Sequence, residues 1–502
     1  MKCKVKIFAS GKIYNVESGT SLHDVLKRSE TEFPCGGKGT CGKCKVKLIN
    51  GDIDIDERHR KMLEKMGLSE EWRLACYSKV HTDITIETEE SGMRIQSDDN
   101  SFKFKPEKGY GIAVDLGSTT IVAQLVDLSN GKIIDTRSAV NPQSHYGADI
   151  ISRISFAMES EQNAETLMWI VRNHIGSEIS NMINDSNIKA KIKIIVIAGN
   201  TVMHHLFSGI NVSPLAVAPF ESPNNDTQIF TASSLKWDLP ETCRIEFLPN
   251  LSHFVGSDIL CGIQACNMQS NEGCSLLVDL GTNGEIALVN NNKIICTSTA
   301  AGPAFEGINI SCGMRATSGA IYAVDWVNDQ YSVKTVNNTQ TRGLCGSGLV
   351  EAIHSLFVSK RIDSTGTVTD NSEYIDITEN VKLTIADIRE FQLAKAALAA
   401  GIFMILKKND IKPEDVNSVY ITGGLGNYLN IEKIKQLGLF NEFDDKNIHK
   451  ISNASLAGCR ELKTKSEVDA YSASSSDFPF KYDVGVTPNI SLNLSLKVLT
   501  SL

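Results

Sequence analysis

The chain has 502 residues, of which 42% are hydrophobic and 22% are charged, and its formal net charge is −9. This length exceeds what one hydrophobic core usually supports, so several folded domains are expected. No long block of lysine and arginine occurs, which argues against a nucleic-acid partner. No stretch approaches the roughly 20 apolar residues of a membrane-spanning helix, and the start lacks the apolar segment of a signal peptide. We therefore expect a cytoplasmic protein without a membrane partner.

Residues 1–90 are predicted to form a small β-grasp domain. Polar and apolar residues alternate along 2–17, 43–55 and 81–89, and the first of these stretches contains a turn at Ser10-Gly11. A helical pattern lies between them at 20–30. Two hairpins and one helix fit a β-grasp fold. Residues 91–109 are polar and aperiodic, which indicates a linker.

The stretch FPCGGKGTCGKC, residues 33–44, places three cysteines in a glycine-rich loop, and a fourth follows in RLACYS. These four candidate metal ligands are Cys35, Cys41, Cys44 and Cys76. Four thiolates can bind a structural zinc ion or an iron-sulfur cluster. Zinc sites favour two pairs of cysteines, whereas three clustered cysteines and a distant fourth are typical of a 2Fe-2S cluster. The loop resembles that of ferredoxins of the adrenodoxin and putidaredoxin type, so a ferredoxin-like domain is predicted.

Two similar segments follow the linker. GIAVDLGSTTIVAQLVDLSNGKII, residues 111–134, and SLLVDLGTNGEIALVNNNKII, residues 275–295, both contain an apolar run, Asp-Leu-Gly, small polar residues and a second apolar run. Each segment reads as a strand, a tight turn and a returning strand. The repeat predicts two similar lobes at 110–270 and 271–462, followed by an unassigned tail at 463–502.

The residues of these turns suit phosphate binding. Gly117 and Gly281 leave room for a phosphate beside the backbone, and Asp115 and Asp279 can hold Mg²⁺ through water. The side chains that can donate to phosphate oxygens are Ser118, Thr119, Thr120, Thr282 and Asn283. A third element, VNSVYITGGLGNYL, leads a strand into Gly423 and Gly424, where the chain can lie against an adenosine. Two ordinary hairpins with polar turns are the alternative.

Together, these three elements resemble the acetate and sugar kinase, Hsp70 and actin superfamily, in which matching turns clamp ATP between two lobes. The resemblance implies a multidomain chain of α+β and α/β class. Its N-terminal β-grasp domain would precede a two-lobed ribonuclease-H-like ATPase.

A narrower resemblance rests on AGNTVMHHLFSGI, TSTAAGPAFEGINISCGMRATSGAI, GLCGSGLVEAI and ITGGLGNYL behind a 2Fe-2S domain. This combination resembles the reductive activators of corrinoid proteins. It implies that the cluster passes an electron to Co(II) of a partner corrinoid protein in a methyltransferase system, giving Co(I), with ATP driving the transfer. An upstream electron donor is implied as well, and a homodimer is one open option.

Three further residues are candidates for this chemistry. Ser298 is a candidate contact to the cobalt face of the partner, or else part of a phosphate-side loop. Asp149, one helical turn before Arg153, is a candidate for orienting the attacking water, or else a surface ion-pair partner. Lys395 is a candidate for lining the base and ribose of the nucleotide, or else part of a solvated helix face.

Two other classes of function stay open. One is a sugar or acyl kinase fused to a ferredoxin domain, although no sugar-specific motif stands out. The other is a nucleotide-gated binding module, against which the cysteine loop argues.

Overall fold

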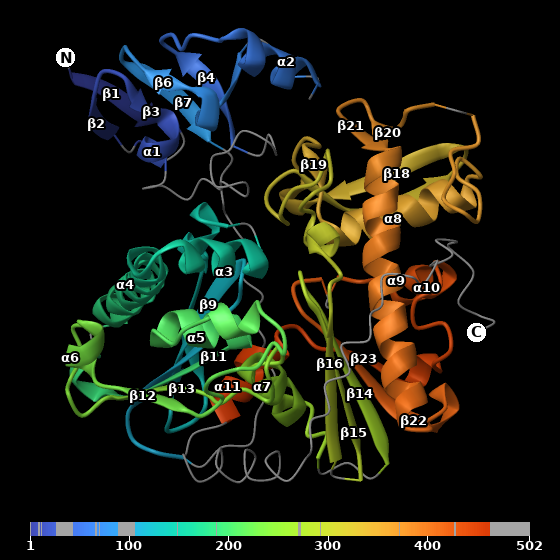
Figure 1. Ribbon diagram of the computed structural model, residues 1–502. Helices are drawn as coiled ribbons and strands as arrows, with labels where there is room; N and C mark the ends of the chain where they lie inside the picture. Colours follow the sequence, from blue (N-terminus) through green and yellow to red (C-terminus); the bar gives the residue numbers. More distant parts are fainter. Residues whose placement is uncertain are drawn as a thin grey trace. The chain divides into compact units, whose positions relative to one another are not determined.

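The computed structural model covers most of the chain. It describes residues 2–8, 11, 13–26, 44–65, 68–69, 71–88, 106–147, 149–186, 188–269, 273–291, 293–370, 372–425 and 428–461. The chain divides into two compact units. One unit contains Met1–Met93, Ser118–Ile121 and Ala139–His174, and the other contains Arg94–Gly117, Val122–Ser138 and Ile175–Leu502. Figure 1 labels many of the helices and strands of both units.

The N-terminal part is built on a five-stranded sheet with the order β2-β1-β7-β4-β5. β1 runs parallel to β7, whereas the pairs β1–β2, β4–β5 and β4–β7 are antiparallel. Alternate side chains of β1 (Cys3, Val5 and Ile7) are buried, as expected for a strand with one covered face. This mixed sheet confirms the predicted β-grasp fold. Its elements are β1 (Lys2–Ile7), β2 (Ile13–Glu17), β3 (Thr20–Ser21), α1 (Leu22–Leu26), β4 (Lys45–Asn50), β5 (Trp72–Leu74), η1 (Ala75–Tyr77), β6 (Lys79–Val80) and β7 (Ile84–Thr88).

A second helix in this part, α2 (Glu57–Lys65), corrects the prediction of a single helix. Its sequence, ERHRKMLEK, is mostly charged, so its apolar periodicity is weak. The helix begins at a side-chain cap, because the backbone N–H of His59 donates to Asp56 Oδ1 at 2.7 Å.

The first sheet after the N-terminal part has the order β10-β9-β8-β11-β13-β12. β8 runs parallel to β11, and β11 runs parallel to β13. The first predicted strand-turn-strand repeat corresponds to β8 and β9. The elements of this half are β8 (Tyr110–Leu116), β9 (Thr120–Asp127), β10 (Ile133–Val140), η2 (Pro142–His145), α3 (Ile150–Glu159), α4 (Glu161–Ser186), η3 (Lys189–Lys191), β11 (Ile192–Gly199), α5 (Thr201–Ser208), η4 (Ser213–Leu215), β12 (Gln228–Phe230), α6 (Ala232–Leu235), β13 (Arg244–Phe247) and α7 (Ser257–Ala265).

The second sheet repeats this plan with the order β16-β15-β14-β22-β23. In both sheets three consecutive strands lie side by side, and a strand from much later in the chain joins in parallel, β11 beside β8 and β22 beside β14. The repeated topology confirms the two similar lobes. The strands of this half are β14 (Cys274–Leu280), β15 (Gly284–Asn290), β16 (Lys293–Thr299), β17 (Ala320–Val327), β18 (Gln330–Thr335), β19 (Gly343–Leu344), β20 (Tyr374–Thr378), β21 (Val381–Thr384), β22 (Val416–Thr422) and β23 (Ile448–Lys450).

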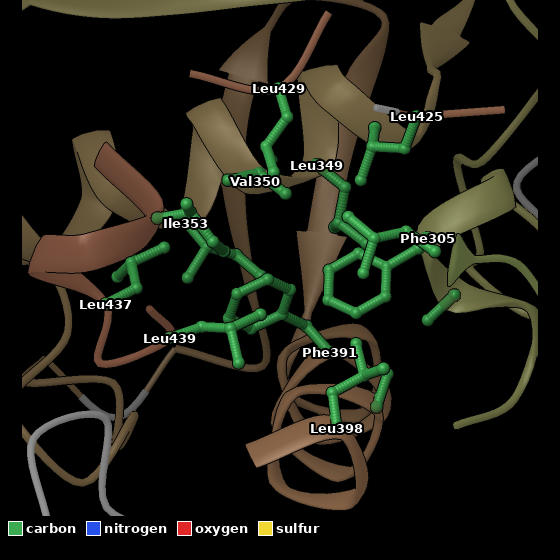
Figure 2. Packing of buried hydrophobic residues seen from close by; sticks show 14 of the residues in the cluster. Phe305, Leu349, Val350, Ile353, Phe391, Leu398, Leu425, Leu429, Leu437 and Leu439 are labelled. Atoms are coloured by element: carbon green, nitrogen blue, oxygen red, sulfur yellow. The ribbon is translucent and has the colours of Figure 1, made fainter. Parts of the chain in front are cut away.

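The core of the second half combines buried residues of its strands with those of two helices, α8 (Gly346–Val358) and α9 (Ile385–Lys408). In Figure 2 the rings of Phe305 and Phe391 meet at its centre; they contact edge to face with centroids 5.7 Å apart. This contact anchors the short helix η5 (Pro303–Glu306) on α9. The other helical segments are η6 (Val336–Asn338), η7 (Pro413–Asp415), α10 (Ile431–Gln436), η8 (Asp445–Asn447) and α11 (Ala454–Glu461).

Helices α7 and α11 pack directly against each other, and Figure 1 shows them side by side. A Cβ atom at Gly458 would lie 2.0 Å from the carbonyl oxygen of Cys261, so the two backbones touch. α7 also packs on β11 of the first sheet and on β14 and β15 of the second. Among the helices that the structure describes, none is both long enough and apolar enough to cross a membrane.

Candidate functional site

Two of the four predicted cluster ligands lie within the described residues, and their thiols are close together. Cys44 directly precedes β4, Cys76 lies in η1, and their Sγ atoms are 3.1 Å apart. The backbone N–H of Ala75 donates to Cys44 O at 2.9 Å, which ties the two segments together. Two thiolates that share a metal ion at about 2.3 Å, as on zinc, come within about 4 Å of each other, so this pair fits a common metal. The other two predicted ligands, Cys35 and Cys41, lie outside the described residues.

Helix α2 supports the segment that carries Cys76. His59 is fully buried, and its Nε2 accepts a hydrogen bond from the backbone N–H of Leu74 at 2.9 Å. Its ring stacks on Tyr77 with the centroids 5.4 Å apart. Burial lowers the pKa of His59, and the positive charge of Arg73 lowers it further, so the ring is neutral at pH 7. The residues on both sides of Cys76 are thus held by a histidine that sequence reasoning did not identify.

In the first phosphate turn, both carboxylate oxygens of Asp115 accept a hydrogen bond. Asn453 Nδ2 donates to Oδ2 at 2.8 Å, and Ser455 Oγ donates to Oδ1 at 2.9 Å. Desolvation raises the pKa of Asp115, and these two hydrogen bonds partly oppose the rise. Gly117 follows the end of β8. The predicted donors Ser118, Thr119 and Thr120 come next in the chain, in the segment that belongs to the other unit, and their role stays a prediction.

The second phosphate turn follows β14 and is tied to a neighbouring loop. Asp279 pairs with Glu285 on β15 and with Thr422 on β22. Thr282 Oγ1 donates to Glu306 Oε1 at 2.7 Å, and the backbone N–H of Gly302 donates to Thr282 O at 3.0 Å. The loop before η5 therefore lies beside Gly281, Thr282 and Asn283, the residues predicted to hold phosphate.

Gly423 lies against this second turn, at a position that only glycine suits. Its φ angle is +94°, and a Cβ atom there would lie 2.5 Å from Asp279 Oδ1 and 2.8 Å from Leu280 O. A Cβ atom at Gly424 would meet no atom of the described residues within 4 Å. The end of β22 therefore approaches Asp279 closely and then opens at Gly424, the arrangement expected for a loop that receives an adenosine.

Four carboxylates near the two larger sheets influence one another: Asp115, Asp258, Asp279 and Glu285. Desolvation raises the pKa of Asp279 well above its ordinary value, and the charges of Asp258, Asp115 and Glu306 add to the shift. Desolvation raises the pKa of Glu285 in the same way, with the other three carboxylates adding to it. Such mutual repulsion is relieved by a bound cation. In the described part of the chain, no three His, Cys, Asp or Glu residues are placed to ligate a metal ion directly.

Asp258 was not identified from the sequence. It lies in the first turn of α7, directly after Gly256 and Ser257. A Cβ atom at Gly256 would lie 2.2 Å from Gly199 O, so this helix begins against the end of β11. Desolvation is the main cause that raises the pKa of Asp258, to about 7. The sequence offered one signal for Asp258: it is an acidic residue at the start of a helix just ahead of the second repeat.

The structure places the remaining predicted residues as follows. Ser298 is half-buried on β16, opposite Glu285. Asp149 is exposed and caps α3, since it accepts a hydrogen bond from the backbone N–H of Ser152 at 2.8 Å. Arg153, one helical turn further along α3, is fully buried.

Lys395 lies on α9 and is 3% exposed, so a solvated helix face is excluded for it. Its Nζ donates to Leu437 O at 3.0 Å, and burial lowers its pKa to about 8. The roles suggested for Asp149, Ser298 and Lys395 stay predictions.

Comparison with known families covers all three parts of the chain. The model of the 2Fe-2S iron-sulfur cluster binding domain matches residues 5–81. The RACo middle region matches 110–271, and the C-terminal ASKHA domain of RACo matches 273–473. The corrinoid activation enzyme RamQ of Eubacterium limosum is 30% identical over 419 residues, which are 78% of this chain and 69% of that relative. This chain belongs to the family of reductive activators of corrinoid proteins.

Two further proteins resemble this activator over most of its length. A reductase from Methanosarcina barkeri, named for a Co(II) methylated amine-specific corrinoid protein, is 26% identical over 389 residues, 70% of this chain and 69% of the reductase. A solved structure of a reductive activator for a corrinoid, iron-sulfur protein aligns with a TM-score of 0.66 and 25% identity over 94% of both chains.

Family membership confirms the resemblance, the fold class and the class of enzyme, an ATP-dependent redox activator. The matched domains also confirm the predicted 2Fe-2S type and the ATPase superfamily. The domain boundaries and the individual site residues stay predictions.

Proposed function

We propose that this activator transfers one electron from its 2Fe-2S cluster to Co(II) of a partner corrinoid protein, which gives Co(I) for methyl transfer, and that ATP drives the step. The observation that carries the proposal is the presence, in one chain, of a convergent thiol pair and a carboxylate cluster shared by two ATPase sheets. The partner would serve a methyltransferase system. An upstream donor in the cytoplasm would return the electron to the cluster.

The energetics explain why ATP is needed. Plant-type ferredoxin clusters have potentials of about −400 mV. Each 59 mV by which the cobalt couple lies lower costs about 1.4 kcal/mol for one electron. ATP can offset this deficit by stabilising a partner conformation in which cobalt is easier to reduce. We favour this route over direct phosphoryl transfer.

In this scheme the chain's own residues bind and orient the nucleotide. Asp115 and Asp279 would meet the hydrated cation from the two sheets, and Thr282 and Asn283 would donate to phosphate oxygens. Gly423 lets the end of β22 approach the second turn, and Gly424, where the chain opens, would leave space for the adenosine. When bound, the cluster supplies single-electron transfer and Mg²⁺ supplies positive charge at the phosphates.

Two carboxylates are candidates for orienting the attacking water. Asp149 is the residue that the sequence suggested, and Asp258 is the one that lies in the carboxylate cluster. With a pKa raised to about 7, Asp258 suits proton exchange near neutral pH. Ser298, opposite Glu285 on β16, is the proposed contact to the partner's cobalt face.

The test is anaerobic reduction of a Co(II) corrinoid protein by the full chain with dithionite. Loss of the Co(II) absorbance band should require ATP. Cys41→Ser should remove or severely disturb the cluster and stop the reduction, while binding of a fluorescent ATP analogue survives. Reduction at the same rate without nucleotide, or phosphoryl transfer to a sugar or acyl acceptor, would contradict the proposal.

A further inference from the structure

Residues 453–455 contact both halves of the ATPase at once. The side chains of Asn453 and Ser455 donate to the two carboxylate oxygens of Asp115, at the end of β8. Between them, the backbone N–H of Ala454 donates to Thr422 Oγ1 at 3.1 Å. Thr422 lies on β22 and pairs with Asp279 on β14. Three consecutive residues therefore join the carboxylate of the first phosphate turn to the strand beside the second.

The amide of Asn453 is oriented by a second hydrogen bond. Its Oδ1 accepts from the backbone N–H of Leu456 at 2.7 Å, as the cap of α11. With Oδ1 committed to the helix, only the NH₂ group is left to face Asp115. The donor is therefore fixed by the start of the helix, and a reversed amide would lose both contacts.

Ser455 is in an equally constrained position. It is 6% exposed in the first turn of α11, and its hydroxyl donates to Asp115 Oδ1 at 2.9 Å. A half-buried carboxylate with both oxygens paired cannot rotate without breaking a charge-assisted hydrogen bond. The orientation of Asp115 thus depends on a segment 338 and 340 residues away in the chain.

We propose that Asn453 and Ser455 are positioning residues, which hold the Asp115 carboxylate in the orientation that meets the hydrated magnesium of the bound nucleotide. This inference rests on the proposed ATP-driven function. Such residues contact a group that binds the metal rather than the metal itself. Their removal typically lowers the metal affinity about 10- to 100-fold. A positioning role predicts that removal of these residues changes the Mg²⁺ dependence of nucleotide binding, whereas a merely structural role does not.

The experiment measures binding of a fluorescent ATP analogue to the full chain as Mg²⁺ is titrated. Asn453→Ser keeps a good helix cap but removes the amide donor, and Ser455→Ala removes the hydroxyl. Each variant should raise the half-saturating Mg²⁺ concentration about 10-fold or more, and Ser455→Thr should restore it because the hydroxyl is kept. Binding of the analogue without Mg²⁺, and the visible spectrum of the cluster, should stay as in the unchanged protein.

Asn430→Ser is the matched control, because Asn430 caps α10 by accepting from the backbone N–H of Lys433, and Asp115 is not among its partners. It should leave the Mg²⁺ titration unchanged. Equal titrations for Asn453→Ser, Ser455→Ala and the unchanged protein would overturn the inference, and so would an equal shift in Asn430→Ser. If the unchanged protein shows no Mg²⁺-dependent binding, the proposed function and the inference both fail. If it shows such binding but the variants do not differ from it, only the inference fails.

Discussion

The two phosphate turns have almost the same sequence, VDLGST and VDLGTN, yet their aspartates have different surroundings. Asp115 receives a hydrogen bond on each oxygen, from Asn453 and Ser455. Asp279 receives none from the described residues, and three neighbouring carboxylates act on it. The protein itself therefore supplies the partners of the first aspartate, whereas the cation of the proposed nucleotide site would relieve the repulsion at the second. One motif, used twice, provides a fixed half and a responsive half of the same site.

The largest expected effect comes from removing the responsive half. Asp279→Asn takes away a charge beside the phosphates and should lower ATP-dependent corrinoid reduction about 10² to 10³-fold, or about 2.7 to 4 kcal/mol. The cluster should still accept an electron from dithionite. Loss of the Co(II) absorbance band measures the effect, and a normal rate in the variant would show that this turn is only structural.

The two candidates for water orientation can be compared directly. Asp258→Asn should lower the ATPase rate stimulated by the corrinoid protein about 10²-fold, within the range for a lost general base. Asp149→Asn should change it less than about threefold, because asparagine caps a helix as well as aspartate does. The measurement is phosphate release in the presence of the partner. The reverse order of effects would assign the water to Asp149.

A smaller effect is expected from Gly423, which approaches Asp279. Gly423→Ala forces a Cβ atom to within 2.5 Å of Asp279 Oδ1 at a φ angle of +94°. It should lower the free energy of unfolding by about 1 to 3 kcal/mol and weaken nucleotide binding. Gly424→Ala is the control, since a Cβ atom there meets open space among the described residues. Urea unfolding of both variants tests this, and equal stability would show that the close approach is absent in solution.

The last prediction concerns the stability of the carboxylate cluster without nucleotide. Glu285 has an ordinary pKa of 4.5 that is raised well above this value in the folded chain, so the folded state binds more protons between the two values. The free energy of unfolding then falls as pH rises through this window, by up to about 1.4 kcal/mol per pH unit. Glu285→Gln should flatten this slope. Its gain in unfolding free energy over the unchanged protein should therefore be larger at pH 8 than at pH 5. Parallel pH profiles from urea unfolding would contradict it.

Sequence reasoning found the parts of the site that are local in the chain. Asp115 and Asp279 lie at the ends of strands that lead into glycine-containing turns, and Gly423 directly follows a strand. Each of these signals is contained within a dozen residues. Asn453 and Ser455 carry no such signal, because their partner lies 338 and 340 residues away. Asp258 looks like an ordinary helix start until the two sheets bring it beside the other carboxylates.

The N-terminal part shows the same limit. The alternating strands and the cysteine spacing were sufficient to predict a β-grasp ferredoxin fold. Helix α2 was missed because its charged sequence has little apolar periodicity. His59 supports the segment that carries Cys76 through two tertiary contacts, to Leu74 and Tyr77. No spacing rule in the sequence connects these residues.

The backbone contact between α7 and α11 restricts how the ATPase can move. Because Gly458 lies against the carbonyl of Cys261, the helices cannot approach further, and because α7 also packs on both sheets, they cannot separate without opening the core. Sliding or rolling at nearly constant separation is the motion that remains, which is shear rather than a gaping hinge. Asp258 lies in the first turn of α7, and Ser455 near the start of α11 donates to Asp115, so a shift of one helix along the other would change the separation of these two carboxylates. The separation of two carboxylates that lie in different parts of the chain is thus set by the contact between α7 and α11.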